Sequence, residues 1–194
     1  SNCILLDVKV GSGAFMKTVP DAVKLAQSMV AIGTGAGRKV EALITNMDRP
    51  LGHAIGNSME VAEVIATLHG EGPDDLTHEC IMLSSRLAAL TGRFSLDEAE
   101  KRAKEVLANG AALAKLHEIV AAQGGDARYI NDPSLFEDAP VSLEVYAPHN
   151  GFVGAIDTEK VGIASAELGA GRLTLDDDID HRAGISLLRN YGDA

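Results

Sequence analysis

A glycine-containing loop follows the first apolar run of the chain and is the first candidate for chemistry. Cys3–Val10 reads as a buried strand, and Gly11, Ser12 and Gly13 leave its carboxyl end. Backbone N–H groups of such a loop can cradle a phosphate. The loop lacks the length of a P-loop and the third glycine of the dinucleotide fingerprint, so the residues favour a plain tight turn. Phe15, at the loop tip, can either plug the core or pack against a planar base.

A second loop, residues 48–57, has the features of a site for a hard cation. Such ions prefer oxygen ligands, often backbone carbonyls with one carboxylate. Pro50 and two glycines restrict this loop, so the carbonyls of Leu51 and Ala54 can point inward, and Glu63 can supply the carboxylate. The alternative is an exposed helix-surface glutamate beside a structural turn, and the residues alone favour it.

Other reactive side chains form no recognised site. The six histidines show no zinc-binding spacing, and no Ser-His-Asp arrangement or nucleophile elbow is present. The acidic run 176–180 lacks the glycine and terminal glutamate of an EF-hand, which favours a solvated turn. Cys3 and Cys80 lie in apolar patterns, and we expect both to be buried, reduced thiols of a cytosolic protein.

The elements that position these loops predict an α/β fold. A helix over 21–32 and a strand over 39–47 complete a βαβ unit with a parallel pair of strands. Apolar stripes and glycine ends then predict a run of four helices over residues 58–69, 75–91, 96–108 and 111–123. These helices should either cover the sheet or project from it as a helical layer. Capping boxes are predicted at Asn57–Glu60 and Ser95–Glu98.

The character of the sequence changes at the loop 126–140. We place residues 1–138 in the later part of an α/β domain, with a parallel or mixed sheet, and 139–194 in an incomplete α+β portion. Strands are predicted over 141–147, 151–156 and within 179–188, with a helix over 158–168. Because residue 1 falls almost on a core strand, we expect the chain to be a fragment of a longer protein.

Composition narrows the class of partner. The formal net charge is −11 over 194 residues, which argues against nucleic acid or an anionic membrane as partner. No apolar run is long enough to cross a membrane. With 46% hydrophobic residues and 4% aromatic residues, the core must consist of aliphatic side chains.

Several motifs follow one another along nearly the whole chain. They are Asp7-Val8-Lys9-Val10-Gly11-Ser12-Gly13-Ala14-Phe15-Met16, Met47-Asp48-Arg49-Pro50-Leu51-Gly52-His53-Ala54-Ile55-Gly56-Asn57, Glu60-Val61, Ala121-Ala122-Gln123-Gly124-Gly125-Asp126 and Leu168-Gly169-Ala170-Gly171-Arg172. Together, and in this order, they resemble the thymidine/pyrimidine-nucleoside phosphorylase family, and their form is closest to the broad pyrimidine-nucleoside phosphorylases.

The resemblance implies reversible phosphorolysis of thymidine- or uridine-type nucleosides to free base and (deoxy)ribose 1-phosphate, in a cytoplasmic homodimer. It implies that Phe15 lines the pyrimidine pocket, and that Leu51, Ala54 and Glu63 contribute to a site for a monovalent cation, K⁺, with no organic cofactor. The family's phosphate loop and helical domain are absent, so no catalytic residue is assigned in this chain and the isolated chain is expected to be inactive.

Two alternatives remain. One is a phosphoribosyltransferase of the same fold, although its acidic magnesium-binding motif is not found. The other is a binding or scaffold module without chemistry.

Overall fold

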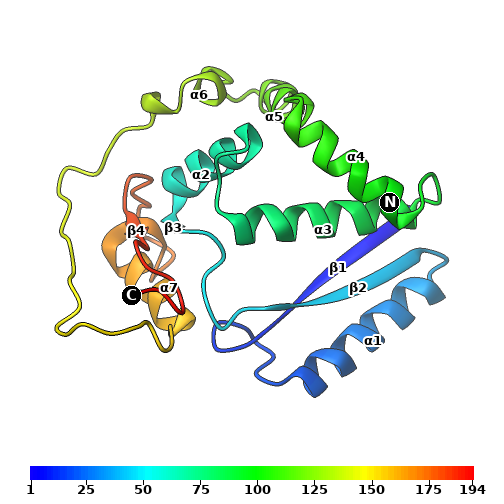
Figure 1. Ribbon diagram of the computed structural model, residues 1–194, viewed down its shortest axis with the longest axis horizontal. Coiled ribbons are helices and arrows are strands. Elements are labelled where there is room, and N and C mark those ends of the chain that lie inside the picture. Colours follow the sequence, from blue (N-terminus) through cyan, green and yellow to red (C-terminus); the bar gives the residue numbers. More distant parts are fainter.

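The computed structural model describes residues 1–194 and is organised around one parallel pair of strands (Figure 1). The strands β1 (Cys3–Val10) and β2 (Lys39–Asn46) run in register from Cys3 opposite Lys39 to Val10 opposite Asn46. The helix α1 (Val19–Gly35) joins them and covers one face of the pair, and α3 (Asp74–Leu90) packs against the other. The predicted βαβ unit and α/β fold class are confirmed.

Small side chains make the core between α1 and the sheet. Val8, Ala22 and Ala26 are buried there, and Leu6, Val10 and Ile44 pack around them. The alanines let the helix approach the strands closely, which suits a chain that is poor in aromatic residues.

Three further helices form a layer beside α3, at the top of Figure 1. They are α2 (Asn57–His69), α4 (Leu96–Ala108) and α5 (Ala111–Ala122), and together with α3 they line an apolar cavity of about 400 Å³. The predicted capping box at Ser95 is confirmed, because Ser95 and Glu98 cap each other's backbone N–H. No helix of the chain combines the length and apolar character that a membrane crossing requires.

The capping box predicted at Asn57 is wrong. The N-cap of α2 is Gly56, whose N–H donates to Glu60 Oε1 (3.1 Å), while Asn57 already belongs to the helix. Its side chain is used elsewhere, since Asn57 Nδ2 donates to the carbonyl of Ala170 (2.7 Å). A long-range contact has therefore replaced the local one.

The C-terminal segment has less regular structure than predicted. After the short helices α6 (Arg128–Asn131) and η1 (Pro133–Leu135), the chain runs irregularly to α7 (Thr158–Ser165) and a π-turn, η2 (Ala166–Ala170). The helix predicted over 158–168 is confirmed. The domain boundary at residue 138 stays a prediction.

The strands predicted over 141–147 and 151–156 are wrong. The alternating side chains of Val141, Leu143 and Val145 are 80–89% exposed, and no neighbouring strand accepts their backbone. Only Val153 makes a strand-like contact, in which its N–H donates to Asp193 O (2.9 Å) and its carbonyl accepts from Gly192 N (3.0 Å). A period-two pattern creates a strand only where a partner completes the ladder.

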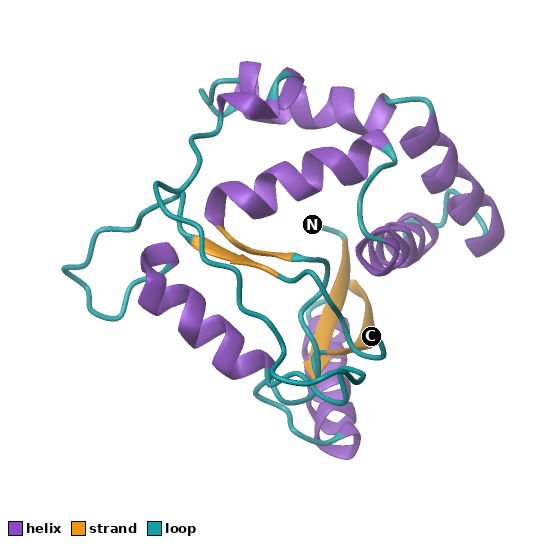
Figure 2. Ribbon diagram, turned by 60° about the vertical axis from the view of Figure 1, so that its left-hand side comes forward, coloured by secondary structure: helices purple, strands orange, loops and turns teal.

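The second sheet joins residues far apart in sequence, and Figure 2 shows it as a separate pair of orange strands. The strand β3 (Ala54–Gly56) pairs antiparallel with β4 (Gly184–Ser186), which lies inside the range where a strand was predicted. The C-terminal segment is thereby attached to the loop that follows β2.

Candidate functional site

The two loops predicted to carry function meet at the carboxyl edge of the β1–β2 pair. Met47 N donates to Val10 O (2.7 Å) and Gly13 N donates to Met47 O (3.0 Å), which ties the loop after β1 to the chain after β2. Ser12 N also donates to Asp48 Oδ1 (2.8 Å). The parallel strands thus bring both loops to the edge where ligands bind in open α/β sheets.

The glycine loop, residues 11–16, is a tight turn and not a phosphate cradle. Four successive N–H groups are used internally, since Gly11 donates to Met16 O and Ala14 to Gly11 O in addition to the bonds of Ser12 and Gly13. Gly11 has φ of +134°, and a Cβ there would lie 2.6 Å from Asp48 N. The plain turn favoured by the sequence is confirmed.

Phe15 projects from this loop with its side chain 99% exposed. It does not plug the core, so that alternative is wrong. An exposed ring at the carboxyl edge of the sheet leaves one of the two sequence-based readings, a flat surface for a planar ligand, and that role stays a prediction.

The second loop is held by Glu63. Its Oε1 accepts from His53 N (2.9 Å) and from Ala54 N (3.1 Å), across ten and nine residues of chain. Gly52 has φ of +72°, and a Cβ on it would collide with Glu63 Oε2. Glu63 is half-buried against the loop, so the alternative of an exposed helix-surface glutamate is wrong.

The peptide of Ala54 faces the side of β3 on which Glu63 lies. Leu187 N donates to His53 O (2.8 Å), so the next pair, Ala54 and Ser186, falls in a non-hydrogen-bonded position of the antiparallel ladder. The N–H and C=O of Ala54 therefore point away from β4, and the N–H reaches Glu63. A carbonyl and a carboxylate on one side of a constrained loop are the donor types that a hard monovalent cation prefers.

An open cavity of about 470 Å³ lies beside this loop. His53 and Glu63 line it together with Glu71, Gly72 and Pro73 from the turn before α3. From the first turn of α3, Asp75 Oδ2 accepts weakly from Gly52 N (3.4 Å). No three His, Cys, Asp or Glu side chains gather as a metal site anywhere in the chain, so an ion at this loop would depend on backbone carbonyls.

A charge cluster on β1 was not predicted. Lys9 Nζ lies 2.8 Å from Asp7 Oδ2 and 2.5 Å from Glu79 Oε1, and Thr45 Oγ1 donates to Asp7 Oδ1 (2.5 Å). Burial lowers the pKa of Lys9, but the hydrogen bonds to Asp7 and Glu79 outweigh it, and the pKa lies above its ordinary value. Because Asp7 and Lys9 are two residues apart in β1, their side chains lie on one face of the strand. This spacing in the sequence could have predicted their ion pair.

The two cysteines are free, as predicted, but they are not both buried. Cys3 is half-buried, and its thiol donates to Leu90 O (3.5 Å). Cys80 is exposed and lines the apolar cavity between the helices. The apolar pattern around Cys80 reflects helix packing next to it and not its own burial.

Comparison with known proteins identifies the family of this arrangement. A model of the a/b domain of a glycosyl transferase family matches residues 2–113, more than half of the chain. The chain belongs to this glycosyl transferase family. A second model, of the pyrimidine nucleoside phosphorylase C-terminal domain, matches residues 152–194.

Curated relatives of this glycosyl transferase chain are similar along its whole length. It is 45% identical over 194 residues to the pyrimidine-nucleoside phosphorylase of Bacillus subtilis and 44% identical over 195 residues to that of Geobacillus stearothermophilus. The enzyme of the same name from Staphylococcus haemolyticus is 43% identical over 194 residues. These alignments cover 100% of the chain and 45% of each relative. The family resemblance predicted from the motifs is confirmed.

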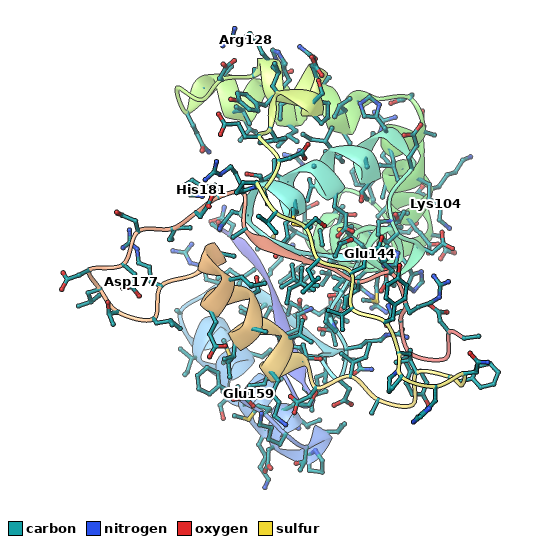
Figure 3. The ribbon with its side chains drawn as sticks, turned by 90° about the vertical axis from the view of Figure 1, so that its left-hand side faces the viewer. Lys104, Arg128, Glu144, Glu159, Asp177 and His181 are labelled. Atoms are coloured by element: carbon teal, nitrogen blue, oxygen red, sulfur yellow. The ribbon has the colours of Figure 1, made fainter.

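The two matched parts of this glycosyl transferase chain touch at both functional loops. At the glycine loop, Lys17 Nζ donates to Ser12 O (2.7 Å) and lies 3.2 Å from Glu159 Oε2. Figure 3 shows Glu159 at the end of α7 that lies toward β1 and α1. At the second loop, Ser165 Oγ donates to Ile55 O (3.0 Å) and Ser58 N to His181 O (3.0 Å).

Proposed function

We propose that the chain is part of a pyrimidine-nucleoside phosphorylase. The enzyme would catalyse reversible phosphorolysis of thymidine- or uridine-type nucleosides: a phosphate oxygen bonds to C1′ of the pentose, the C1′–N1 bond breaks, and the base leaves with that electron pair and takes up a proton. The observation that carries this proposal is 45% identity along all 194 residues to a pyrimidine-nucleoside phosphorylase.

The geometry of the site supports a role for this chain in binding the base and not the phosphate. The N–H groups of the glycine loop are already used, so this chain offers no phosphate cradle there. Its contribution would be the exposed ring of Phe15 as a surface for the pyrimidine. Because the chain spans 45% of the length of its curated relatives, phosphate would be held by groups outside these 194 residues.

We further propose a K⁺ site at the second loop. The main-chain carbonyls of Leu51 and Ala54 and the carboxylate of Glu63 would be the ligands from this chain. The residues fit such an ion, because the Ala54 peptide and Glu63 face each other and the loop is fixed by Gly52. When bound, the cation would supply positive charge that helps to hold an anionic substrate nearby.

The remaining expectations concern the whole protein. A homodimer and a cytoplasmic location are proposed from the family resemblance, and the two free cysteines fit a reducing compartment.

The test is phosphorolysis by the full-length protein that contains this chain. Incubation with uridine or thymidine and inorganic phosphate should release free base and pentose 1-phosphate, followed by ultraviolet absorbance and chromatography. The isolated 194-residue chain should release none.

Three outcomes would contradict the proposal. Base release by the isolated chain would remove the need for an external phosphate site. Release of base from a nucleoside 5′-monophosphate by pyrophosphate, with formation of the pyrophosphorylated sugar phosphate, and no release from a nucleoside by phosphate, would indicate a phosphoribosyltransferase. No turnover by the full-length protein would favour a binding module.

A further inference from the structure

Thr158, the first residue of α7, packs directly against Gly13 of the glycine loop. A Cβ added to Gly13 would lie 2.7 Å from Cγ2 and 2.9 Å from Cβ of Thr158. The φ of Gly13 is not in the left-handed region, so an alanine is excluded there by the threonine and not by the backbone. Gly13 and Thr158 come from the two separately matched parts of the chain, 2–113 and 152–194.

This contact depends on packing. Thr158 is only 8% exposed, and its Oγ1 and the Oγ of Ser12 are both buried without a hydrogen-bond partner in the chain. Because a buried hydroxyl without a partner costs free energy, these side chains are not placed there by hydrogen bonding. The shape of the Thr158 side chain against Gly13 is what defines the contact.

Polar contacts flank the packed pair. Asp157 is the N-cap of α7 and accepts from Lys160 N (3.1 Å), which fixes the turn that carries Thr158. Lys17 bridges the Ser12 carbonyl and Glu159. Both charged groups of that bridge are more than half exposed, so its contribution is small beside that of the packing.

We infer that Thr158 is a positioning residue for the nucleoside site. Its side chain packs against Gly13 of the glycine loop, and that loop holds Phe15 at the carboxyl edge of the sheet. Phosphorolysis would therefore require the C-terminal segment for the geometry of the pyrimidine pocket. The inference rests on the proposed function in one respect, that Phe15 contacts the base.

The experiment uses Gly13→Ala in the full-length protein, with Thr158→Gly as the compensating change. Gly13→Ala should displace the loop and raise KM for the nucleoside about tenfold, the scale of one aromatic–base contact, with KM for phosphate unchanged. Gly13→Ala/Thr158→Gly should return it to within about threefold of the wild-type value, since the two Thr158 atoms closer than 3.0 Å are gone. The one close atom that remains is Met47 Cγ, at 3.2 Å on a flexible side chain.

A matched control separates this contact from general damage to the loop. Gly11→Ala is strained by its φ of +134° and meets Asp48 and Met47, so Thr158→Gly should not rescue it. Rescue of both glycine variants, or of neither, would overturn the inference.

A second readout does not depend on activity. Amide hydrogen exchange of residues 11–18 should be faster in Gly13→Ala and restored in the double variant. If the wild type lacks phosphorolysis, the proposed function fails while this exchange measurement still decides the inference. If Gly13→Ala does not fold, Thr158→Ala alone should speed exchange in residues 11–18, and unchanged exchange would contradict the support role.

Discussion

The two loops at the carboxyl edge of the β1–β2 pair are fixed by different means. The glycine loop uses its N–H groups on neighbouring backbone and Asp48, and it leaves Phe15 almost fully exposed. The second loop, residues 48–57, is the proposed cation loop, and its residues His53 and Ala54 give their N–H groups to one carboxylate, Glu63, from the helix that follows. The glycine loop therefore presents the ring of Phe15, whereas the cation loop presents backbone groups and the carboxylate of Glu63.

The two loops also differ in how far residues of this chain complete a binding site at each of them. Glu63 lies nine residues from Ala54, so helix α2 brings the carboxylate to the loop as soon as it forms. A planar ligand needs a second surface opposite Phe15, and no residue of the chain covers that ring. The cation loop is therefore the more complete candidate site.

The largest expected effect is on the cation loop. Glu63→Ala should lower the apparent K⁺ affinity of the full-length protein about 10- to 100-fold, because the carboxylate that faces the Ala54 peptide is removed together with its two backbone contacts. The other carboxylate at the loop, that of Asp75, reaches only Gly52 N, at 3.4 Å. The affinity is measured from the rise of Tm with KCl, with choline chloride to hold ionic strength constant.

Glu60→Ala is the matched control for that variant. Glu60 lies on the same helix and also accepts a loop N–H, from Gly56, but it does not contact the Leu51–Ala54 loop. It should retain the K⁺-dependent rise of Tm. Equal loss in both variants would mean that helix stability, and not a cation site, explains the effect.

Gly52→Ala tests how closely Glu63 approaches the loop. The φ of +72° alone should cost about 1–3 kcal/mol, and the collision of the new Cβ with Glu63 Oε2 should add to it. Gly37→Ala is the control, because Gly37 has φ of +73° and no atom within 4 Å of the added Cβ. Denaturant unfolding of both variants measures the difference, and equal destabilisation would place Glu63 away from the loop.

Phe15→Ala should separate the glycine loop from the cation loop. Since the ring is 99% exposed, the free energy of unfolding should change by less than about 0.5 kcal/mol. KM for the nucleoside should rise about tenfold through loss of the contact with the base, and the K⁺ dependence should be unchanged. Phe15→Tyr keeps the flat ring and should retain most of the affinity, whereas a large fall in stability for Phe15→Ala would show that the ring packs in the folded protein.

Much of the fold follows from local patterns in the sequence. The run Cys3–Val10, the stripe of α1 and the glycine ends of the helices each depend on neighbouring residues, and all were predicted. Glu63 was also expected at the second loop, and it does bond to the N–H groups of that loop, although residue types alone favoured an exposed position. Its role as a cation ligand stays a prediction.

The parts that could not be predicted depend on distant partners. Strands 141–147 and 151–156 have the right alternation but no ladder, whereas β3 and β4 pair across about 130 residues with little local signal. Asn57 resembles a cap but bonds to Ala170. The bond of Lys9 to Glu79 requires α3 to pack against the sheet, which no spacing along the chain specifies.

The smallest expected effect concerns the cap of α7, which supports the glycine loop and does not contact the cation loop. Hydrogen bonding to the Lys160 side chain, and then to its backbone N–H, lowers the pKa of Asp157 from its ordinary value of 3.8. A carboxyl whose pKa is lower in the folded state adds stability above its unfolded pKa, and that stability is lost as the pH falls through the folded value. Asp157→Asn keeps an N-capping oxygen but no charge, so it should lower Tm by about 2 °C at neutral pH, and the difference from wild type should shrink as the pH falls below 3.8. Asp157→Ala also removes the cap and should remain less stable than wild type at neutral pH and at acidic pH. If the Asn variant differs equally from wild type at both pH values, the charge of Asp157 does not stabilise α7, and the glycine loop depends on the packing of Thr158 alone.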